Sequence, residues 1–115
     1  MKRNGHKFNA VRTEVDGYQF ASKAEAKRYA ELKLLEKAGK IAHLKLQPKF
    51  MLLVWDCMKE QDVQIGSYVG DFQYWDVTHE KTVVEDVKGV KTPLYRLKKK
   101  IVQHRLGIEI TEITT

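Results

Sequence analysis

The sequence predicts an α/β (α+β) fold in which helices flank a mixed central sheet. Two segments carry helix start and stop signals, at residues 22–39 and 92–107, and strand-like apolar segments lie between and after them. The 115 residues, 43% of them hydrophobic, suffice for one modest core. We therefore expect a single domain, 1–115, with the core order helix, three strands, helix, strand.

The N-terminal part is expected to be an arm followed by a short hairpin. Residues 1–7 are basic and polar, as is typical of a flexible arm. Apolar residues in 8–15 and 18–20 flank Asp16-Gly17, and both residue types tolerate the positive φ of a two-residue hairpin turn.

The first helix is expected to begin after Ser22 and to end at Gly39. Ser22 and Glu25 have the spacing of a capping box, and glycine suits the left-handed residue that closes a helix. The inward face is expected to carry an apolar stripe made of Tyr29, Leu32 and Leu35.

Three strands are expected next. Phe50–Trp55 is almost continuously apolar, which predicts a strand buried on both faces. The polar stretch Asp56–Gln64 is expected to be a loop, followed by strands over Ile65–Trp75 and Thr82–Lys88. Short connections, including the turn 76–81, predict an antiparallel meander, in which the aromatic residues of the second strand pack within the sheet.

The second helix is expected to start at Thr92-Pro93 and to end at Gly107, followed by a strand with alternating apolar residues over 108–113. Four residues are expected on the inward face of this helix: Leu94, Leu97, Ile101 and Leu106.

The charge distribution favours a polyanionic partner. The net charge is +6, and residues 88–105 contain seven Lys or Arg residues and no acid. The alternative is an ordinary solvated surface. We expect DNA contacts from this segment, through Lys91, Tyr95, Arg96, Lys98, Lys99, Lys100, His104 and Arg105.

Other compositional features exclude several classes of protein. No apolar run approaches the roughly 18 residues of a membrane span, and the N-terminus does not resemble a signal peptide. The lone Cys57 excludes an internal disulfide and argues against a cysteine zinc site. We expect a cytoplasmic protein with no membrane partner.

Charged residues within the predicted strands indicate a reactive site. Asp71 lies in one strand, and Asp86 and Lys88 share a face of the next because side chains alternate along a strand. Asp71 and Asp86 are expected to lie side by side, where two carboxylates repel unless a cation joins them. A divalent metal held by both, with the Val87 carbonyl, satisfies that requirement. The alternative is a surface strand with a cross-strand ion pair.

Two further acids are candidates for this site. Glu85 is expected on the opposite face, unless a bulge reverses the alternation. Glu25 has a sufficient role as a capping residue, yet it also heads the buried stripe of the first helix. We favour Glu25 as an additional carboxylate of the metal site.

These residues resemble the pattern of the PD-(D/E)XK nuclease superfamily, over nearly the whole chain from about Ser22. Asp16-Gly17, Gln47-Pro48 and the two strand motifs resemble more narrowly an uncharacterised family of small phage and prophage proteins assigned to that superfamily. The pattern is also similar to phage Holliday junction-resolving endonucleases and to the end-cleaving subunit of some transposons. One departure is Gly70-Asp71, where the superfamily nominally has Pro-Asp.

The resemblance implies a restriction-endonuclease-like αβββαβ core. It implies Asp71 and Asp86 as metal ligands, Lys88 as the catalytic lysine and Glu25 as the helix carboxylate. It also singles out Gln47, for which a structural role before Pro48 is an equal alternative.

We therefore expect a Mg²⁺-dependent endodeoxyribonuclease, with Mn²⁺ as a substitute, acting on duplex or branched DNA in a bacterial host cell. Symmetric cleavage of two strands would require a homodimer. The alternatives are a nucleic-acid-binding module without activity and a phage accessory protein of the same fold.

Overall fold

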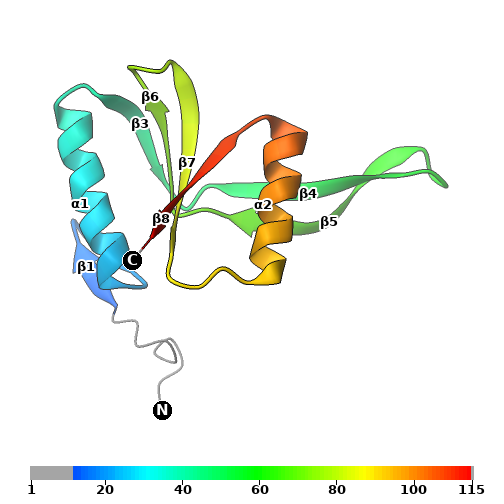
Figure 1. The fold of residues 1–115 in the computed structure, drawn as a ribbon, viewed down its shortest axis with the longest axis horizontal. Helices are drawn as coiled ribbons and strands as arrows, with labels where there is room; N and C mark the ends of the chain where they lie inside the picture. Colours follow the sequence, from blue (N-terminus) through cyan, green and yellow to red (C-terminus); the bar gives the residue numbers. More distant parts are fainter. Residues whose placement is uncertain (1–11, 115) are drawn as a thin grey trace, which may run out of the picture.

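The computed structural model describes residues 12–114, and these contain two helices and eight strands (Figure 1). The central sheet has the order β3-β6-β7-β8, in which β7 and β8 are parallel and the other neighbours antiparallel. The expected mixed sheet with flanking helices is confirmed. The elements are β1 (Thr13–Val15), β2 (Tyr18–Phe20), α1 (Lys23–Lys37), β3 (Ile41–Leu46), β4 (Lys49–Asp56), β5 (Gln61–Val69), β6 (Phe72–Asp76), β7 (Lys81–Lys88), α2 (Pro93–Leu106) and β8 (Glu109–Thr114).

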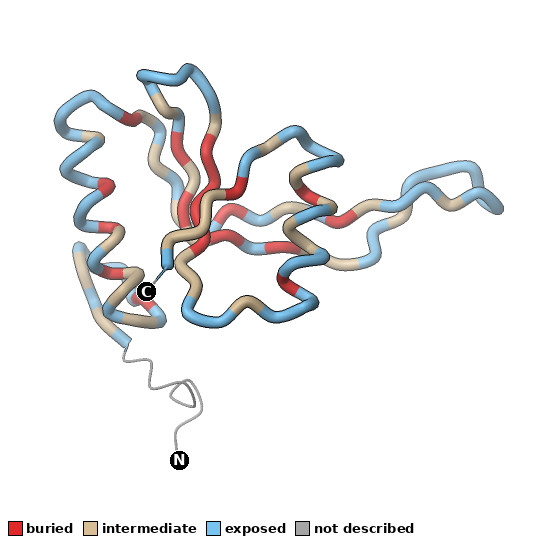
Figure 2. Tube along the Cα trace, in the orientation of Figure 1, coloured by how far each residue is buried: buried red, intermediate tan, exposed pale blue. Residues whose placement is uncertain are grey.

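The two helices cover opposite faces of this sheet, so the core has two layers. On one side α1 packs against β3, β6 and β7, and on the other α2 packs against β7, β8 and the base of β4 and β5. Adjacent residues of β7, Val83 and Val84, belong to different layers because side chains alternate along a strand. Figure 2 shows the buried residues gathered on the middle of the sheet and on the inward turns of the helices.

Local signals at the chain's turns and helix ends are confirmed. The Ser22 hydroxyl accepts a hydrogen bond from the Glu25 amide at 3.2 Å, and the Thr92 hydroxyl caps α2 in the same way. Gly39 and Gly107 adopt the expected left-handed conformation. Strands β1 and β2 form the predicted hairpin around Asp16-Gly17, while the predicted arm, 1–7, lies outside the described residues. In the described part of the chain, neither helix has the length and apolarity to cross a membrane.

The prediction of which residues of α2 face the sheet is largely wrong. Leu94 and Leu97 are 60% and 55% exposed, and Leu106 is also exposed. Tyr95 and Val102 face the sheet instead. Tyr95 explains why α2 turns a different face to the sheet. Its ring packs near Tyr68, and its hydroxyl donates to Glu112 of β8. A leucine could make the packing contact but not the hydrogen bond. In α1, Leu35 is likewise more exposed than predicted.

The predicted strand Phe50–Trp55 is confirmed as part of β4, but its predicted burial on both faces is wrong, and the predicted loop Asp56–Gln64 is too long because β5 begins at Gln61. Strands β4 and β5 form one long antiparallel hairpin that pairs as far as Asp56↔Gln61. The hairpin forms a separate two-stranded sheet and projects from the body of the molecule (Figure 1). Both faces of its outer half meet solvent, so Trp55 is exposed although its segment is apolar. This geometry also replaces the predicted three-stranded meander by two hairpins, β4–β5 and β6–β7.

Strand β3 was not predicted. It forms the edge of the central sheet beside β6, and its pairing is shifted between Ala42 and Lys45. His43 has a positive φ of 57° at this irregularity. Ala42, Leu44 and Leu46 alternate with polar His43 and Lys45, so the sequence carried a short strand signal that the prediction missed.

The predicted strand Ile65–Trp75 is split at Gly70-Asp71, where the chain passes from the β4–β5 hairpin into the central sheet. The Gly70 amide donates to the Pro48 carbonyl, and the Asp71 amide donates to the Glu85 carbonyl, both at 2.9 Å. A Cβ at position 70 would lie 2.8 Å from Val84 Cγ1. Glycine before Asp71 is therefore a steric requirement, and proline would also lose the hydrogen bond to Pro48.

Candidate active site

The candidate site lies where β6 begins, β7 ends and α1 begins. Asp71 directly precedes β6, whose first residue, Phe72, pairs with Glu85, and the Asp71 amide donates to the Glu85 carbonyl at 2.9 Å. Asp71 Oδ2 accepts a hydrogen bond from the Val87 amide at 2.6 Å, which holds this carboxylate against the end of β7. The expected neighbourhood of Asp71 and Asp86 is thus a consequence of the strand register.

Asp86 and Lys88 lie on the same face of β7, as strand alternation predicts. The Asp86 side chain is buried, and its Oδ2 accepts a short hydrogen bond from the Tyr68 hydroxyl. Lys88 Nζ lies 3.4 Å from Asp86 Oδ1 and 4.4 Å from the centre of the Tyr95 ring. The ammonium is therefore held between a carboxylate and an aromatic face, which limits its positions without removing its charge.

Glu85 points to the opposite side of the sheet and is 1% exposed. Arg28 of α1 binds it through two hydrogen bonds of 2.7 Å and 2.6 Å, and the Tyr74 hydroxyl donates a third. Burial costs a carboxylate several kcal/mol unless such partners satisfy it. Glu85 thus ties α1 to the sheet, and the alternative that placed it in the site does not fit this geometry.

Electrostatic coupling links the carboxylates of the site. Burial, followed by the charge of Glu25, raises the pKa of Asp71 to about 7, and Asp86 adds to this effect. Burial and then the charge of Asp86 also raise the pKa of Glu25, while Lys88 acts in the opposite direction. Glu25 therefore joins Asp71 and Asp86 in a region of excess negative charge, in addition to heading α1.

This charge fits a divalent cation. Within residues 12–114, no three His, Cys, Asp or Glu side chains are arranged to enclose a metal ion. Asp71 and Asp86, however, provide two neighbouring carboxylates whose repulsion a cation would relieve, and oxygen ligands are those that Mg²⁺ prefers. The two aspartates and the Val87 carbonyl are the donors that would hold it, with Glu25 close to them.

Replacing Asp71 by Asn is expected to raise thermal stability at pH 8 when no metal is present. An unfolded Asp has a pKa near 3.9, whereas that of folded Asp71 is about 7. Between these values only the folded state keeps the proton, so the carboxyl's contribution to stability falls as pH rises. The advantage of Asp71→Asn should therefore shrink toward pH 4, which thermal unfolding followed by circular dichroism would measure.

The control is Asp76→Asn, at the last residue of β6. Hydrogen bonds from the backbone and side chain of His79 lower the pKa of Asp76, so this substitution should not stabilise the protein at pH 8. Added Mg²⁺ should raise the unfolding temperature of the wild type more than that of Asp71→Asn. A destabilised Asp71→Asn at pH 8, or equal responses to Mg²⁺, would contradict this account of the site.

A pocket of about 240 Å³ opens beside these acids. Glu25 and Asp71 line one part of it, and Gln47 joins them because its backbone amide donates to the Asp71 carbonyl at 2.9 Å. The structure thus brings the three residues together. The rest of the lining comes from the β1–β2 hairpin and the end of β3, namely Tyr18, Gln19, Phe20 and Leu46.

The basic side chains of residues 91–105 divide into two groups. Glu112 of β8 binds Lys91, Lys99 and the Tyr95 hydroxyl, and the first of these contacts contributes most to lowering the pKa of Glu112 to about 2. Arg105 is paired with Asp62 of the projecting hairpin. These residues anchor α2. Exposed charge remains on Arg96 and Lys100, with His104 exposed beside them and Lys98 half-buried.

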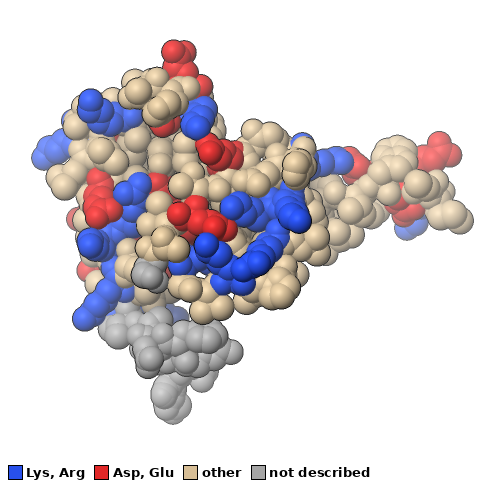
Figure 3. All heavy atoms as spheres, viewed as in Figure 1, with Lys and Arg blue, Asp and Glu red and all other residues tan. Residues whose placement is uncertain are grey.

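Figure 3 shows Lys and Arg gathered over α2 and the strip beside β8, around acidic atoms.

Two residues that position the site were not foreseen in this role. Tyr68 was expected only to pack in the sheet, and it also holds Asp86. Glu112 carried no recognisable signal, because its place opposite Asp86 depends on the parallel register of β7 and β8.

Comparison with known proteins gives one family. A family model described as "Protein of unknown function (DUF1064)" matches residues 5–113, which is nearly the whole chain. The chain belongs to the DUF1064 family. No curated protein and no solved structure matches the chain significantly. Family membership therefore leaves the activity to be inferred from the site itself.

Proposed function

We propose that this protein is a metal-dependent endonuclease that hydrolyses phosphodiester bonds in DNA. The observation that supports the proposal most strongly is the convergence of Asp71, Asp86 and Lys88. Two carboxylates with excess negative charge lie beside an ammonium held at 3.4 Å from one of them. Carboxylates that gather a cation next to a fixed lysine are suited to phosphoryl chemistry, in which negative charge increases on the phosphate oxygens.

The roles of the residues follow from their contacts. Asp71 and Asp86 would bind Mg²⁺, or Mn²⁺ as a substitute, which polarises the scissile phosphate and lowers the pKa of the attacking water. Tyr68 and the Val87 amide orient the two carboxylates. Lys88, steadied over the Tyr95 ring, would position the water or offset charge on the phosphate.

DNA binding would come from the remaining basic side chains of α2. Arg96, Lys98, Lys100 and His104 are suited to phosphate contacts, which confer affinity without base specificity and weaken with salt. Lys91, Tyr95, Lys99 and Arg105 would assist mainly by fixing the helix, since each has a partner within the fold.

Cleavage of both strands at symmetric positions would require a homodimer. The bacterial cytoplasm, in a phage or prophage setting, is the compartment that this proposal implies.

The test is nicking of supercoiled plasmid by purified protein in Mg²⁺ or Mn²⁺ and in EDTA. The wild type should nick only with metal, and Asp86→Asn should lose activity because it removes charge while keeping an oxygen for the Tyr68 hydroxyl. Binding of plasmid, junction and flap DNA without any cleavage would favour a non-catalytic binding module. Activity that persists in EDTA or in Asp86→Asn would point to a contaminant or a different site.

A further inference from the structure

The pocket beside Glu25 and Asp71 combines groups that suit a nucleobase. Tyr18, half-exposed on the β1–β2 hairpin, contributes an aromatic ring, and Gln47 contributes a carboxamide, whereas the Gln19 carboxamide donates to Glu14 across the hairpin. We propose that this pocket takes an unpaired nucleobase next to the scissile phosphate, so that the substrate is DNA with a single-stranded or branched segment. This inference rests on the proposed function, because it places the base relative to the same carboxylates.

The chemistry of the lining argues for a base over other small groups. A carboxamide offers both donors and an acceptor, as the hydrogen-bonding edge of a base does. Aromatic rings stack on bases of any sequence. A base within a duplex has its edge paired and both faces stacked, so it can enter such a pocket only when unpaired or extruded.

The hairpin that carries Tyr18 is held in place by α1. The Tyr29 hydroxyl donates to Asp16 at 3.0 Å, within the hairpin turn. The Tyr18 and Tyr29 rings meet edge to face, with centroids 5.9 Å apart. These two contacts fix the hairpin against α1, so the Tyr18 ring forms a wall of the pocket whose position is set before any ligand binds.

The backbone at Gln47 supports a role for its side chain. Gln47 has a φ of 50°, a left-handed conformation that is costly for a residue with a Cβ, and it precedes Pro48. Asp16, Glu60 and Glu80 share this conformation in hairpin turns, whereas Gln47 lies in the connection between β3 and β4. Glycine would adopt it at less cost. A glutamine here keeps a carboxamide beside Asp71, and strain retained in this way is typical of functional positions.

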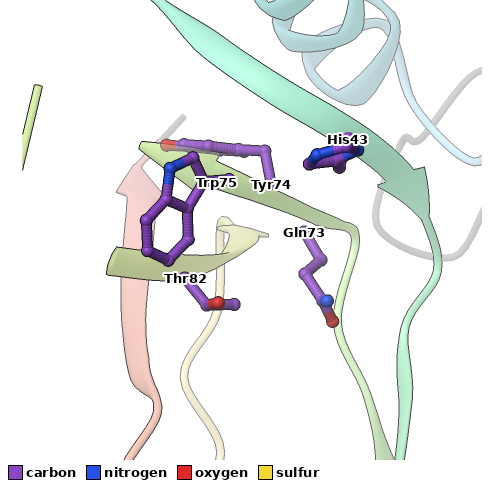
Figure 4. Close-up of a pocket in the computed structure, with 5 residues that line it drawn as sticks. All are labelled: His43, Gln73, Tyr74, Trp75 and Thr82. Carbon is purple, nitrogen blue, oxygen red and sulfur yellow. The ribbon is translucent and has the colours of Figure 1, made fainter. Parts of the chain in front are cut away.

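A second pocket, of about 250 Å³, provides an internal control. Its lining residues come from β3, β6 and β7, as Figure 4 shows, and include a glutamine and two aromatic rings: His43, Gln73, Tyr74, Trp75 and Thr82. It shares no residue with the pocket beside Asp71. The residue types of a pocket therefore do not by themselves identify a site for a nucleobase. The first pocket differs from the second because Glu25 and Asp71 line it.

The experiment measures binding apart from cleavage. A Lys88→Met background limits cleavage, and the probes are a duplex with a single-stranded flap and the same duplex fully paired, each carrying 2-aminopurine near the junction. The flap should bind more tightly and its fluorescence should fall on stacking. Tyr18→Ala should weaken flap binding roughly tenfold, and Gln47→Gly should also weaken it, without lowering the unfolding temperature.

Two matched variants control for backbone and composition. His43→Gly relieves the same kind of positive φ, and Gln73→Ala removes a carboxamide from the second pocket. Both should keep the preference for the flap. Equal affinity for paired and unpaired DNA, or an equal loss in Gln73→Ala, would overturn the base pocket even if plasmid is nicked. An absence of cleavage on every DNA would overturn the proposed function instead, while the binding preference remains measurable.

Discussion

A Lys88→Met variant is expected to cleave DNA roughly 10²–10³-fold more slowly than the wild type, which is the usual cost of losing one group that stabilises transition-state charge. Methionine keeps an unbranched stem over the Tyr95 ring, so packing should change little while the ammonium near Asp86 is lost. The rate constant for nicking under saturating protein, measured beside DNA affinity, separates a chemical defect from a binding defect.

Lys81→Met is the matched control for this prediction. Lys81 begins the same strand, and its Nζ lies 2.6 Å from a carboxylate of neighbouring β8, Glu109, at the surface. The two substitutions remove the same charge from β7. Equal losses of activity would indicate a general electrostatic effect, and full activity in Lys88→Met would remove Lys88 from the mechanism.

Arg28→Met is expected to destabilise the fold by about 3–5 kcal/mol, because it leaves the buried Glu85 carboxylate without its cation. Among the described residues, the Tyr74 hydroxyl would then be the remaining side-chain partner of Glu85, which is 1% exposed. A domain of this size has a total stability of about 5–15 kcal/mol, so the variant should lose a large part of it. Urea unfolding at pH 7 measures the difference.

Two companion variants make this result interpretable. Glu31→Ala removes the other partner of Arg28, an exposed ion pair of 3.1 Å, and should cost no more than about 1 kcal/mol. The double variant Arg28→Met with Glu85→Met removes both charges and should recover much of the loss. If Arg28→Met costs no more than Glu31→Ala, the pair does not anchor α1 in the way that the contacts indicate.

The predicted features that are confirmed depend on short stretches of chain. Ser22 and Gly39 bound α1 through contacts that lie within a few residues, and the same holds for α2. The shared face of Asp86 and Lys88 follows from strand alternation alone. The strand in β4 was predicted correctly but its burial was not, because an exposed hairpin and a buried strand can have the same apolar sequence.

By itself, the sequence determined the helices, their ends, the mixed fold class and the strand carboxylates that became the candidate site. Only the tertiary structure decided that Gly70 carries the chain between two sheets, that Arg28 neutralises Glu85, and that Glu112 binds Lys91 and Lys99. Arg28 and Glu85 are 57 residues apart. Contacts at that separation depend on strand register and helix rotation, which periodicity and local propensity do not specify.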